Sequence, residues 1–298
     1  MNEIGDAFSQ NEDLIPLSGR EFTYITALVY DRFGIHLPEQ KKVLVSGRLS
    51  KRLRRLGCKN FSDYVRLLEN DPTGAEISEM INLLTTNHSF FFREGEHFDF
   101  LANKVLPDLS GEFARGGPYP LRIWSAGCAS GEEVYSVAML LHDRFAGKPG
   151  APDIGLLATD ISLHALRTAR EGIYAAQKFN DMPSRFRQRY LSATEEREYA
   201  VADEIKAMVL FKRLNLMAES YPMKGQFDVV FCRNVMIYFN QESRNRVVST
   251  LYRYVKPGGY LFIGHSESLP REWNPFDYVK PAIYRKGVQP TKSQGVRR

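Results

Sequence analysis

Residues 121–140, LRIWSAGCASGEEVYSVAML, restrict the possible folds of this chain more than any other segment. The pattern predicts a short buried strand, a glycine-containing turn and an amphipathic helix. Such a unit often binds the phosphates of a nucleotide, because the free N–H groups of a helix N-terminus attract anions. Here, however, Glu132 and Glu133 occupy the first turn of the predicted helix. The expected ligand must therefore tolerate or require negative charge at this position.

The chain after residue 120 alternates between predicted strands and helices. This alternation predicts an α/β fold with a mostly parallel sheet and helices on both faces. The alternation breaks between residues 174 and 214, where we expect an inserted antiparallel β-subdomain. The strands are predicted at 121–126, 154–160, 227–234, 258–265 and 281–286, the helices at 132–145, 162–170 and 241–255, and the subdomain elements at 184–190, 197–205 and 207–215.

The segment before the glycine turn reads as a small all-helical domain over residues 18–90. Ser18 and Glu21 have the spacing of a capping box, and Ser62 is a candidate cap for a later helix. The predicted helices cover about 18–33, 39–56, 61–70, 74–86 and 94–106. The full division is a flexible N-terminus at 1–17, the helical domain at 18–90, a linker helix and loop at 91–120, a second domain at 121–286 and a flexible tail at 287–298.

Several classes of protein are excluded by what the sequence lacks. No apolar run approaches the length of about 20 residues that a membrane helix needs, and the N-terminus has no secretory signal, so we expect a cytoplasmic protein. The cysteines at 58, 128 and 232 form no CxxC pair. The six histidines form no HxxxH or HExxH pair either, so we expect no metal site, although distant residues could still converge.

Basic charge is concentrated in one predicted helix. The chain has a net charge of +5, whereas residues 41–55 alone carry seven basic residues and no acidic one, so the rest of the chain sums to −2. On a helical wheel the charges lie beside an apolar stripe, which predicts a cationic ridge for docking an acidic partner. The alternative is a solvated face. The ridge residues are Arg48, Lys51, Arg52 and Arg55.

A cationic ligand explains the glutamates of the glycine turn. Gly127 and Gly131 allow positive φ and close approach of the backbone, but GxGxxG and GxxxxGK[ST] are both absent. S-adenosylmethionine fits this turn, since it has a sulfonium, an ammonium and no phosphate. Asp160 ends the second strand, where an acidic residue commonly accepts hydrogen bonds from ribose hydroxyls. The alternative is that the glutamates only favour a helix N-terminus.

Five segments in order resemble the CheR-type chemotaxis receptor methyltransferases. They are LLTTNHSFFFRE, IWSAGCASGEEVYS, ATDIS, RNVMIYF and GHSES, and the resemblance covers about residues 18–286. It implies a helical N-terminal domain and a Rossmann-like methyltransferase domain with an inserted β-subdomain. The implied reaction moves a methyl group from S-adenosylmethionine to glutamate side chains of chemoreceptors, which leaves S-adenosylhomocysteine.

The resemblance also implies site residues. Arg93 and Tyr238 correspond to the positions nearest the transferred methyl group. We expect Arg93 to orient the acceptor carboxylate and Tyr238 to shape the pocket, against the alternatives of a surface ion pair with Glu94 or Glu96 and a core aromatic. Ser89 departs mildly from a position that is often threonine. The implied cofactor contacts are Asn87, Ser89, Arg93, Glu133, Asp160, Asn215, Leu216, Arg233 and Asn234.

The expected partner is the acidic helical methylation region of a chemoreceptor. The loop at 192–199, SATEEREY, contains no glycine, which favours action without a C-terminal receptor tether. We expect a monomer that neither binds nucleic acid nor inserts into a membrane. Two rival functions stay open: a nucleic-acid methyltransferase, which the absence of a [DNS]PP[YFW] motif disfavours, and a non-catalytic S-adenosylmethionine-binding adaptor.

Overall fold

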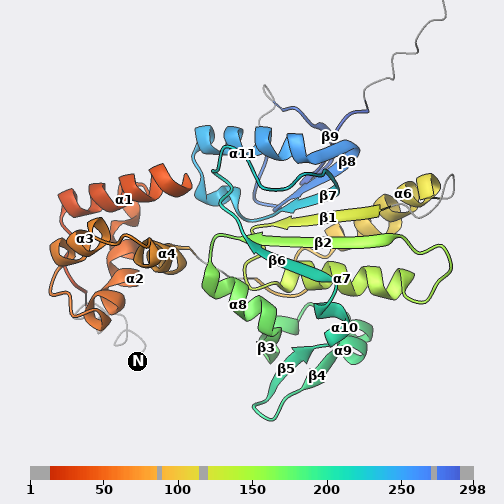
Figure 1. Ribbon diagram of the computed structural model, residues 1–298, viewed down its shortest axis with the longest axis horizontal. Coiled ribbons are helices and arrows are strands. Elements are labelled where there is room, and N and C mark those ends of the chain that lie inside the picture. The colour runs from red at the N-terminus through yellow and green to blue at the C-terminus, as the bar shows by residue number, and fades with distance from the viewer. Residues whose placement is uncertain (1–13, 86–88, 114–119, 270–273, 289–298) are drawn as a thin grey trace, which may run out of the picture.

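The computed structural model describes residues 14–85, 89–113, 120–269 and 274–288. A small helical domain, red and orange in Figure 1, lies beside a larger α/β domain. The expected flexible ends at 1–13 and 289–298 fall outside the described residues. Ile15 belongs to the segment predicted to be flexible, yet its N–H donates to Ser50 Oγ at 3.0 Å and its carbonyl accepts from Ser46 Oγ at 2.8 Å. The described start of the chain is therefore attached to the helical domain.

The helical domain has helices that lie close to the predicted ones. Its capping box is present, since Ser18 Oγ accepts from the N–H of Glu21 and the Glu21 carboxylate accepts from the N–H of Ser18. The predicted cap at Ser62 is wrong: Asn60 has the extended backbone of a cap and accepts from the N–H of Asp63. Its elements are α1 (Gly19–Phe33), the 3₁₀ turn η1 (Glu39–Lys41), α2 (Lys42–Arg55), α3 (Phe61–Glu69) and α4 (Ala75–Leu84).

A helix longer than predicted joins the two domains. It runs from α5 (Glu96–Phe100) through a π-helical stretch, η2 (Leu101–Val105), into α6 (Leu106–Phe113). The prediction placed its end near residue 106, before the glycine- and proline-rich segment. The helix instead continues into the start of that segment, up to Phe113.

The central sheet confirms the predicted α/β fold. Strands β6, β2, β1, β7 and β8 are parallel neighbours, and β10 and β9 extend the sheet in antiparallel fashion. Figure 1 shows α11 above the sheet and α7 and α8 below it. The bounds are β1 (Pro120–Ala126), β2 (Asp153–Asp160), β6 (Val209–Arg213), β7 (Phe227–Cys232), β8 (Val255–Ile263), β9 (Asp277–Lys280), β10 (Ile283–Arg285), α7 (Glu132–Phe145), α8 (Leu163–Glu171) and α11 (Gln241–Tyr254).

Alternate strand residues form two apolar cores, one on each face of the sheet. Ile123 and Phe231 belong to the core beneath α7, whereas Trp124 and Val230 belong to the core beneath α11. The second core is continuous with the interior of the helical domain. The helical domain is therefore packed onto one face of the α/β domain rather than linked to it by a loop alone.

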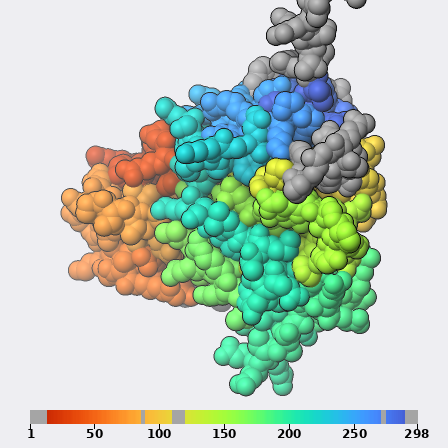
Figure 2. Space-filling view, turned by 45° about the vertical axis from the view of Figure 1, so that its right-hand side comes forward, coloured from red at the N-terminus to blue at the C-terminus, as the bar shows by residue number. Residues whose placement is uncertain are grey.

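The inserted subdomain is smaller than predicted. A three-stranded antiparallel sheet of order β3-β5-β4 is present, and Figure 2 shows this subdomain protruding from the body of the molecule. The predicted strand at 207–215 does not belong to it: β6 pairs in parallel with β2, with Val209 opposite Leu156, and forms an edge of the main sheet. The subdomain elements are β3 (Ile173–Ala175), η3 (Ala176–Phe179), α9 (Ser184–Tyr190), β4 (Leu191–Ala193), β5 (Glu198–Val201) and α10 (Asp203–Lys206).

No helix in the described residues combines the length and the apolar composition that crossing a membrane requires.

Candidate active site

The glycine turn after β1 has the predicted left-handed backbone. Gly127 has φ 84° and Gly131 has φ 95°, and Ala129, midway between them, is also left-handed at φ 47°. A Cβ on Gly127 would lie 2.3 Å from Val235 Cγ2, so this position has no room for a side chain. The turn thereby brings its backbone against the loop that follows β7.

The two glutamates of the turn have different roles. Glu132 is fully buried and points away from the turn's open side: Lys178 Nζ donates to Glu132 Oε1 at 2.8 Å and to the carbonyl of Ser89 at 2.5 Å. Glu132 thus joins α7 to the subdomain and to the 89–93 segment. Glu133 instead lines a pocket at the carboxyl ends of the strands. Of the two negative charges noted in the sequence, only that of Glu133 therefore faces the pocket.

Arg233 forms ion pairs with both Glu133 and Glu94. Its Nη1 lies 3.2 Å from Glu133, and its Nη2 lies 3.0 Å from Glu94 and donates to the carbonyl of Arg93. Burial raises the pKa of Glu133, and the Arg233 guanidinium and the Ser125 hydroxyl oppose this shift. The pKa of Glu94 is lowered, because Arg233 outweighs the effect of burial. Two carboxylates therefore share one guanidinium beside the pocket.

Asp160 lies where the sequence predicts, at the end of β2 and in the same pocket. Its carboxylate accepts hydrogen bonds from the N–H of Ala129 at 2.9 Å and of Ser162 at 2.8 Å. Burial raises the pKa of Asp160, and these backbone donors only partly offset the shift. Each oxygen retains a lone pair, so the carboxylate can still accept hydrogen bonds from ligand hydroxyls.

The loop after β7 carries Asn234 and Tyr238 into the pocket. Asn234 is left-handed at φ 59°, a strained conformation that functional sites often hold. The half-buried carboxylate of Glu267 fixes this loop, since it accepts from the N–H groups of Asn234 at 2.9 Å, Ile237 at 3.2 Å and Gly264 at 2.6 Å. Tyr238 lies in η4 (Met236–Tyr238).

The helical domain forms one wall of the pocket. The N–H of His36 donates to the Tyr238 carbonyl at 2.8 Å, and Ile35 pairs with Phe239 as an isolated antiparallel bridge. Asn215 Nδ2 donates to the carbonyl of Arg32 at 2.7 Å. These contacts hold Phe33 and Ile35 at the pocket, so the site is completed by the first domain.

The pocket collects the predicted site residues that the structure describes. Its volume is about 1000 Å³, including the part open to solvent. Asn87 lies outside the described residues. The predicted residues that line the pocket are Ser89, Arg93, Glu133, Asp160, Asn215, Leu216, Arg233, Asn234 and Tyr238. The pocket is also lined by residues for which no contact was predicted, including Phe33, Ile35, Thr85, Phe98, Cys128 and Phe239.

Two of the three phenylalanines before Arg93 anchor this segment. Phe91 and Phe92 are buried: Phe91 stacks on Phe179, and Phe92 stacks on Phe186. Phe90 instead lines the pocket. Phe92 and Glu94 are left-handed at φ 56° and 58°, so Arg93 sits between two strained residues. The anchored phenylalanines hold the backbone of Arg93 at the pocket.

The predicted cationic ridge on α2 needs correction. Arg52 does not extend into solvent: its guanidinium binds the buried carboxylate of Glu76, with Nη2 2.5 Å from Oε2, and Glu76 also accepts from Tyr64. Arg48 Nη1 donates to the carbonyl of Leu84, 2.5 Å away. The helical wheel missed these contacts because it does not show where α4 packs. Lys51, Arg54 and Arg55 are exposed.

The pocket fits S-adenosylmethionine. Glu133 and Asp160 supply carboxylates for a cationic group and for ribose hydroxyls, and the backbone of the glycine turn approaches closely. Phe90, Phe98 and Val235 supply apolar surface. The fold and this site define an S-adenosylmethionine-dependent methyltransferase.

The comparisons identify the family. The profile described as "CheR methyltransferase, SAM binding domain" matches residues 87–284, and "CheR methyltransferase, all-alpha domain" matches residues 20–85. The "Chemotaxis protein methyltransferase" of Borreliella burgdorferi is 41% identical over 286 residues, which cover 96% of this chain and 100% of the relative. The protein of the same name in Escherichia coli is 39% identical over 262 residues, which cover 87% and 88%. This chain belongs to the CheR methyltransferase family.

Three residues that organise the site were not identified from the sequence. Glu94 and Glu267 lie inside the motifs FFFRE and GHSES, but only the folded loops show what their carboxylates bind. The role of Lys178 could not be inferred from the sequence, since no motif or spacing distinguishes it from other lysines. Its partner Glu132 was noticed for its charge, and a buried charge requires a partner.

Proposed function

We propose that this methyltransferase esterifies glutamate side chains in the cytoplasmic methylation regions of chemoreceptors, as part of adaptation in chemotaxis. The observation that carries the proposal is that Arg93 and Tyr238 line the same pocket as Glu133 and Asp160, although they come from different loops. The relatives' name, "Chemotaxis protein methyltransferase", supports the receptor substrate.

The chain needs no general base for this reaction. A glutamate side chain has a reference pKa near 4.3, so the acceptor is already an anion at neutral pH. When bound, S-adenosylmethionine supplies an electrophilic methyl group on a sulfonium. The remaining task of the protein is to align the acceptor oxygen with that group and to exclude water, because opposite charges are lost in the transition state.

Arg93 and Tyr238 perform the alignment in this proposal. Arg93 offers a planar guanidinium that suits a carboxylate, and Tyr238 borders the same pocket. Phe33 and Ile35 of the helical domain and Phe239 after β7 contribute apolar walls. These walls exclude water from the site where the acceptor and the methyl donor meet.

The exposed cations of α2 form the receptor-docking surface in this proposal. Lys51 and Arg55 remain on it, whereas Arg48 and Arg52 support it from within the domain. We propose that the enzyme acts without a receptor tether. In the loop between β4 and β5, Arg197 takes the left-handed conformation at φ 61° that a glycine would adopt most easily.

The test is transfer of a labelled methyl group to a panel of receptor cytoplasmic fragments. Base treatment should release labelled methanol, which marks a methyl ester. A matched fragment with its candidate glutamates replaced by alanine serves as the control. Stable binding of S-adenosylmethionine with no transfer to any fragment would contradict the proposal, and so would label that survives base.

A further inference from the structure

His97 is fully buried, yet neither of its ring nitrogens has a hydrogen-bond partner within the described part of the chain. A buried polar group without a partner costs about 1–3 kcal/mol, so such a group calls for an explanation such as an ion or an ordered water. Burial and the nearby Arg233 charge lower the pKa of His97 to about 3. A neutral imidazole has a lone pair on one ring nitrogen, and an unpartnered nitrogen of this kind can bind a cation.

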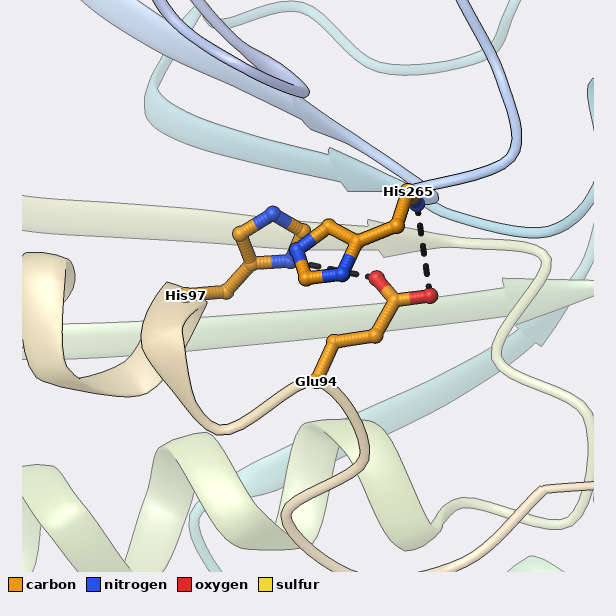
Figure 3. Close-up of side chains that lie close together, drawn as sticks. All are labelled: Glu94, His97 and His265. Carbon is orange, nitrogen blue, oxygen red and sulfur yellow. Dashed lines mark hydrogen bonds and ion pairs between the residues drawn. The ribbon is translucent and has the colours of Figure 1, made fainter.

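Two further metal-ligand side chains lie beside His97. Glu94 lies three residues before it, in the loop that leads into α5, and His265 follows β8 (Figure 3). One ligand atom from each of the three residues lies within 4.8 Å of the other two. The rings of His97 and His265 meet edge to face, with centroids 4.7 Å apart. This cluster could not be recognised from sequence spacing, because the two histidines are 168 positions apart (97 and 265).

The distance from His97 to Glu94 fits shared coordination better than a hydrogen bond. His97 Nδ1 lies 3.4 Å from Glu94 Oε2 (Figure 3), and the pair does not meet hydrogen-bond geometry. Good N–H···O bonds are about 2.9–3.0 Å long. Ligands at about 2.0–2.1 Å from a tetrahedral Zn²⁺ are separated by roughly 3.3–3.4 Å. His265 is exposed, so its side chain can turn to close the remaining distance.

The local charge balance leaves room for a cation. Arg233 lies 3.0 Å from Glu94 and would repel a metal ion, but it is also paired with Glu133, so two carboxylates face one guanidinium. The cluster is not part of the cofactor pocket, because none of its three side chains lines that pocket. A cation reaching it from the His265 side would not displace the cofactor.

We propose that Glu94, His97 and His265 bind a divalent transition-metal ion such as Zn²⁺, with water completing the coordination. Two imidazoles and one carboxylate are a common ligand set for such ions and a poor one for Mg²⁺ or Ca²⁺, which prefer oxygen. Because Arg233 contacts Glu94 on one side and Glu133 on the other, the metal would be coupled to the cofactor pocket through Arg233.

The test measures metal binding by the full chain without cofactor. Zn²⁺ affinity is obtained by competition with a chromophoric chelator, and Co²⁺ is added as a visible probe of coordination. The wild type should bind one equivalent with the absorption of a low-coordinate Co²⁺ site. His265→Ala should bind roughly 100-fold more weakly, since an exposed ligand is lost without disturbing the core. Mg²⁺ at the same concentration should not compete.

His164→Ala is the matched control, because His164 is also exposed and lies on α8, outside the cluster. It should keep the wild-type affinity. The variant Glu94→Gln should also weaken Zn²⁺ binding. This second ligand variant keeps the proposal testable if His265→Ala does not fold. The proposal is overturned if the wild type binds no Zn²⁺, if His265→Ala matches it, or if both histidine variants lose binding equally. None of these outcomes bears on methyl transfer, so the proposed function is tested separately.

Discussion

Arg233 at the end of β7 forms an ion pair with Glu133 in the first turn of α7, with 3.2 Å between Nη1 and Oε2. This pair joins two neighbouring strand ends of the central sheet at the pocket. It explains how a carboxylate persists at a helix start that resembles a phosphate site, because the guanidinium compensates its charge. Since Glu94 faces the same guanidinium, this edge of the pocket has no excess of positive charge that would attract a phosphate.

The first prediction concerns Asp160→Asn. The carboxylate is expected to accept charge-assisted hydrogen bonds from the cofactor, and its loss should cost about 1.5–3 kcal/mol, or roughly 10- to 150-fold in affinity. Calorimetric titration with S-adenosylmethionine measures this. Asp181→Asn, at an exposed position in the subdomain, is the control and should bind as the wild type does. Equal affinities for both variants would remove Asp160 from the cofactor site.

The second prediction concerns proton release. Burial raises the pKa of Asp160 and of Glu133, so each holds its proton to a higher pH than an exposed carboxyl would. Both contributions favour the folded protein at low pH and are lost as the pH rises through the folded-state pKa values. A cationic ligand favours the ionised forms. Binding should therefore release protons and weaken as the pH falls.

Calorimetry in two buffers of different ionisation enthalpy measures this release, with titrations at about pH 5 and about pH 7. The Asp160→Asn variant should release fewer protons than the wild type, because one of the two titrating groups is gone. An affinity that does not change over this range, with no buffer dependence of the enthalpy, would show that neither carboxyl titrates on binding.

Most of the fold could be predicted from local patterns. The boundaries of α7 and the capping box of α1 follow from apolar periodicity and from residues adjacent in the chain. Two errors are local, the cap at Ser62 and the early end of the helix before β1. The larger error involves partners far apart in sequence. The strand at 209–213 has the same local pattern whether it pairs within the subdomain or with β2, and only the packing of the sheet decides.

The candidate site likewise contains residues whose position follows from local pattern and residues whose position does not. Asp160 could be placed because strand ends meet at one edge of a parallel sheet. Arg52 could not be placed, since its ion pair depends on how α4 packs against α2. A helical wheel assigns a direction to each side chain but does not show which neighbouring element lies there. Roles that depend on such neighbours need the folded structure.

The third prediction concerns Arg93→Ala. Turnover should fall by about a hundredfold or more, because the acceptor carboxylate loses its orienting group. The fold should survive, since Phe91 and Phe92 hold the segment and Arg233 binds the backbone carbonyl of Arg93, which the substitution keeps. Initial rates and cofactor affinity are measured together. Arg93→Lys should recover only part of the rate, because lysine lacks the planar fork. Near-normal turnover in Arg93→Ala would assign Arg93 to the surface.

The last prediction separates docking from stability on α2. The double variant Lys51→Glu and Arg55→Glu should slow receptor methylation at low salt, because exposed cations steer the encounter with an acidic partner. Cofactor affinity and thermal midpoint should stay unchanged. The difference from wild type should shrink as salt rises, since exposed charges are screened beyond about 8 Å at physiological ionic strength.

Arg52→Ala should instead lower the stability of the fold, because it leaves Glu76, whose side chain is 8% exposed, without its cation. We expect a loss of roughly 1–3 kcal/mol in the free energy of unfolding, measured by denaturant titration. A double variant at exposed lysines outside α2, Lys148→Glu and Lys224→Glu, controls for net charge and should methylate receptors at the wild-type rate. If the α2 double variant matches this control at low salt, the exposed face of α2 is only solvated. The receptor would then dock elsewhere, and the protruding β3-β5-β4 subdomain would be the next surface to reverse in charge.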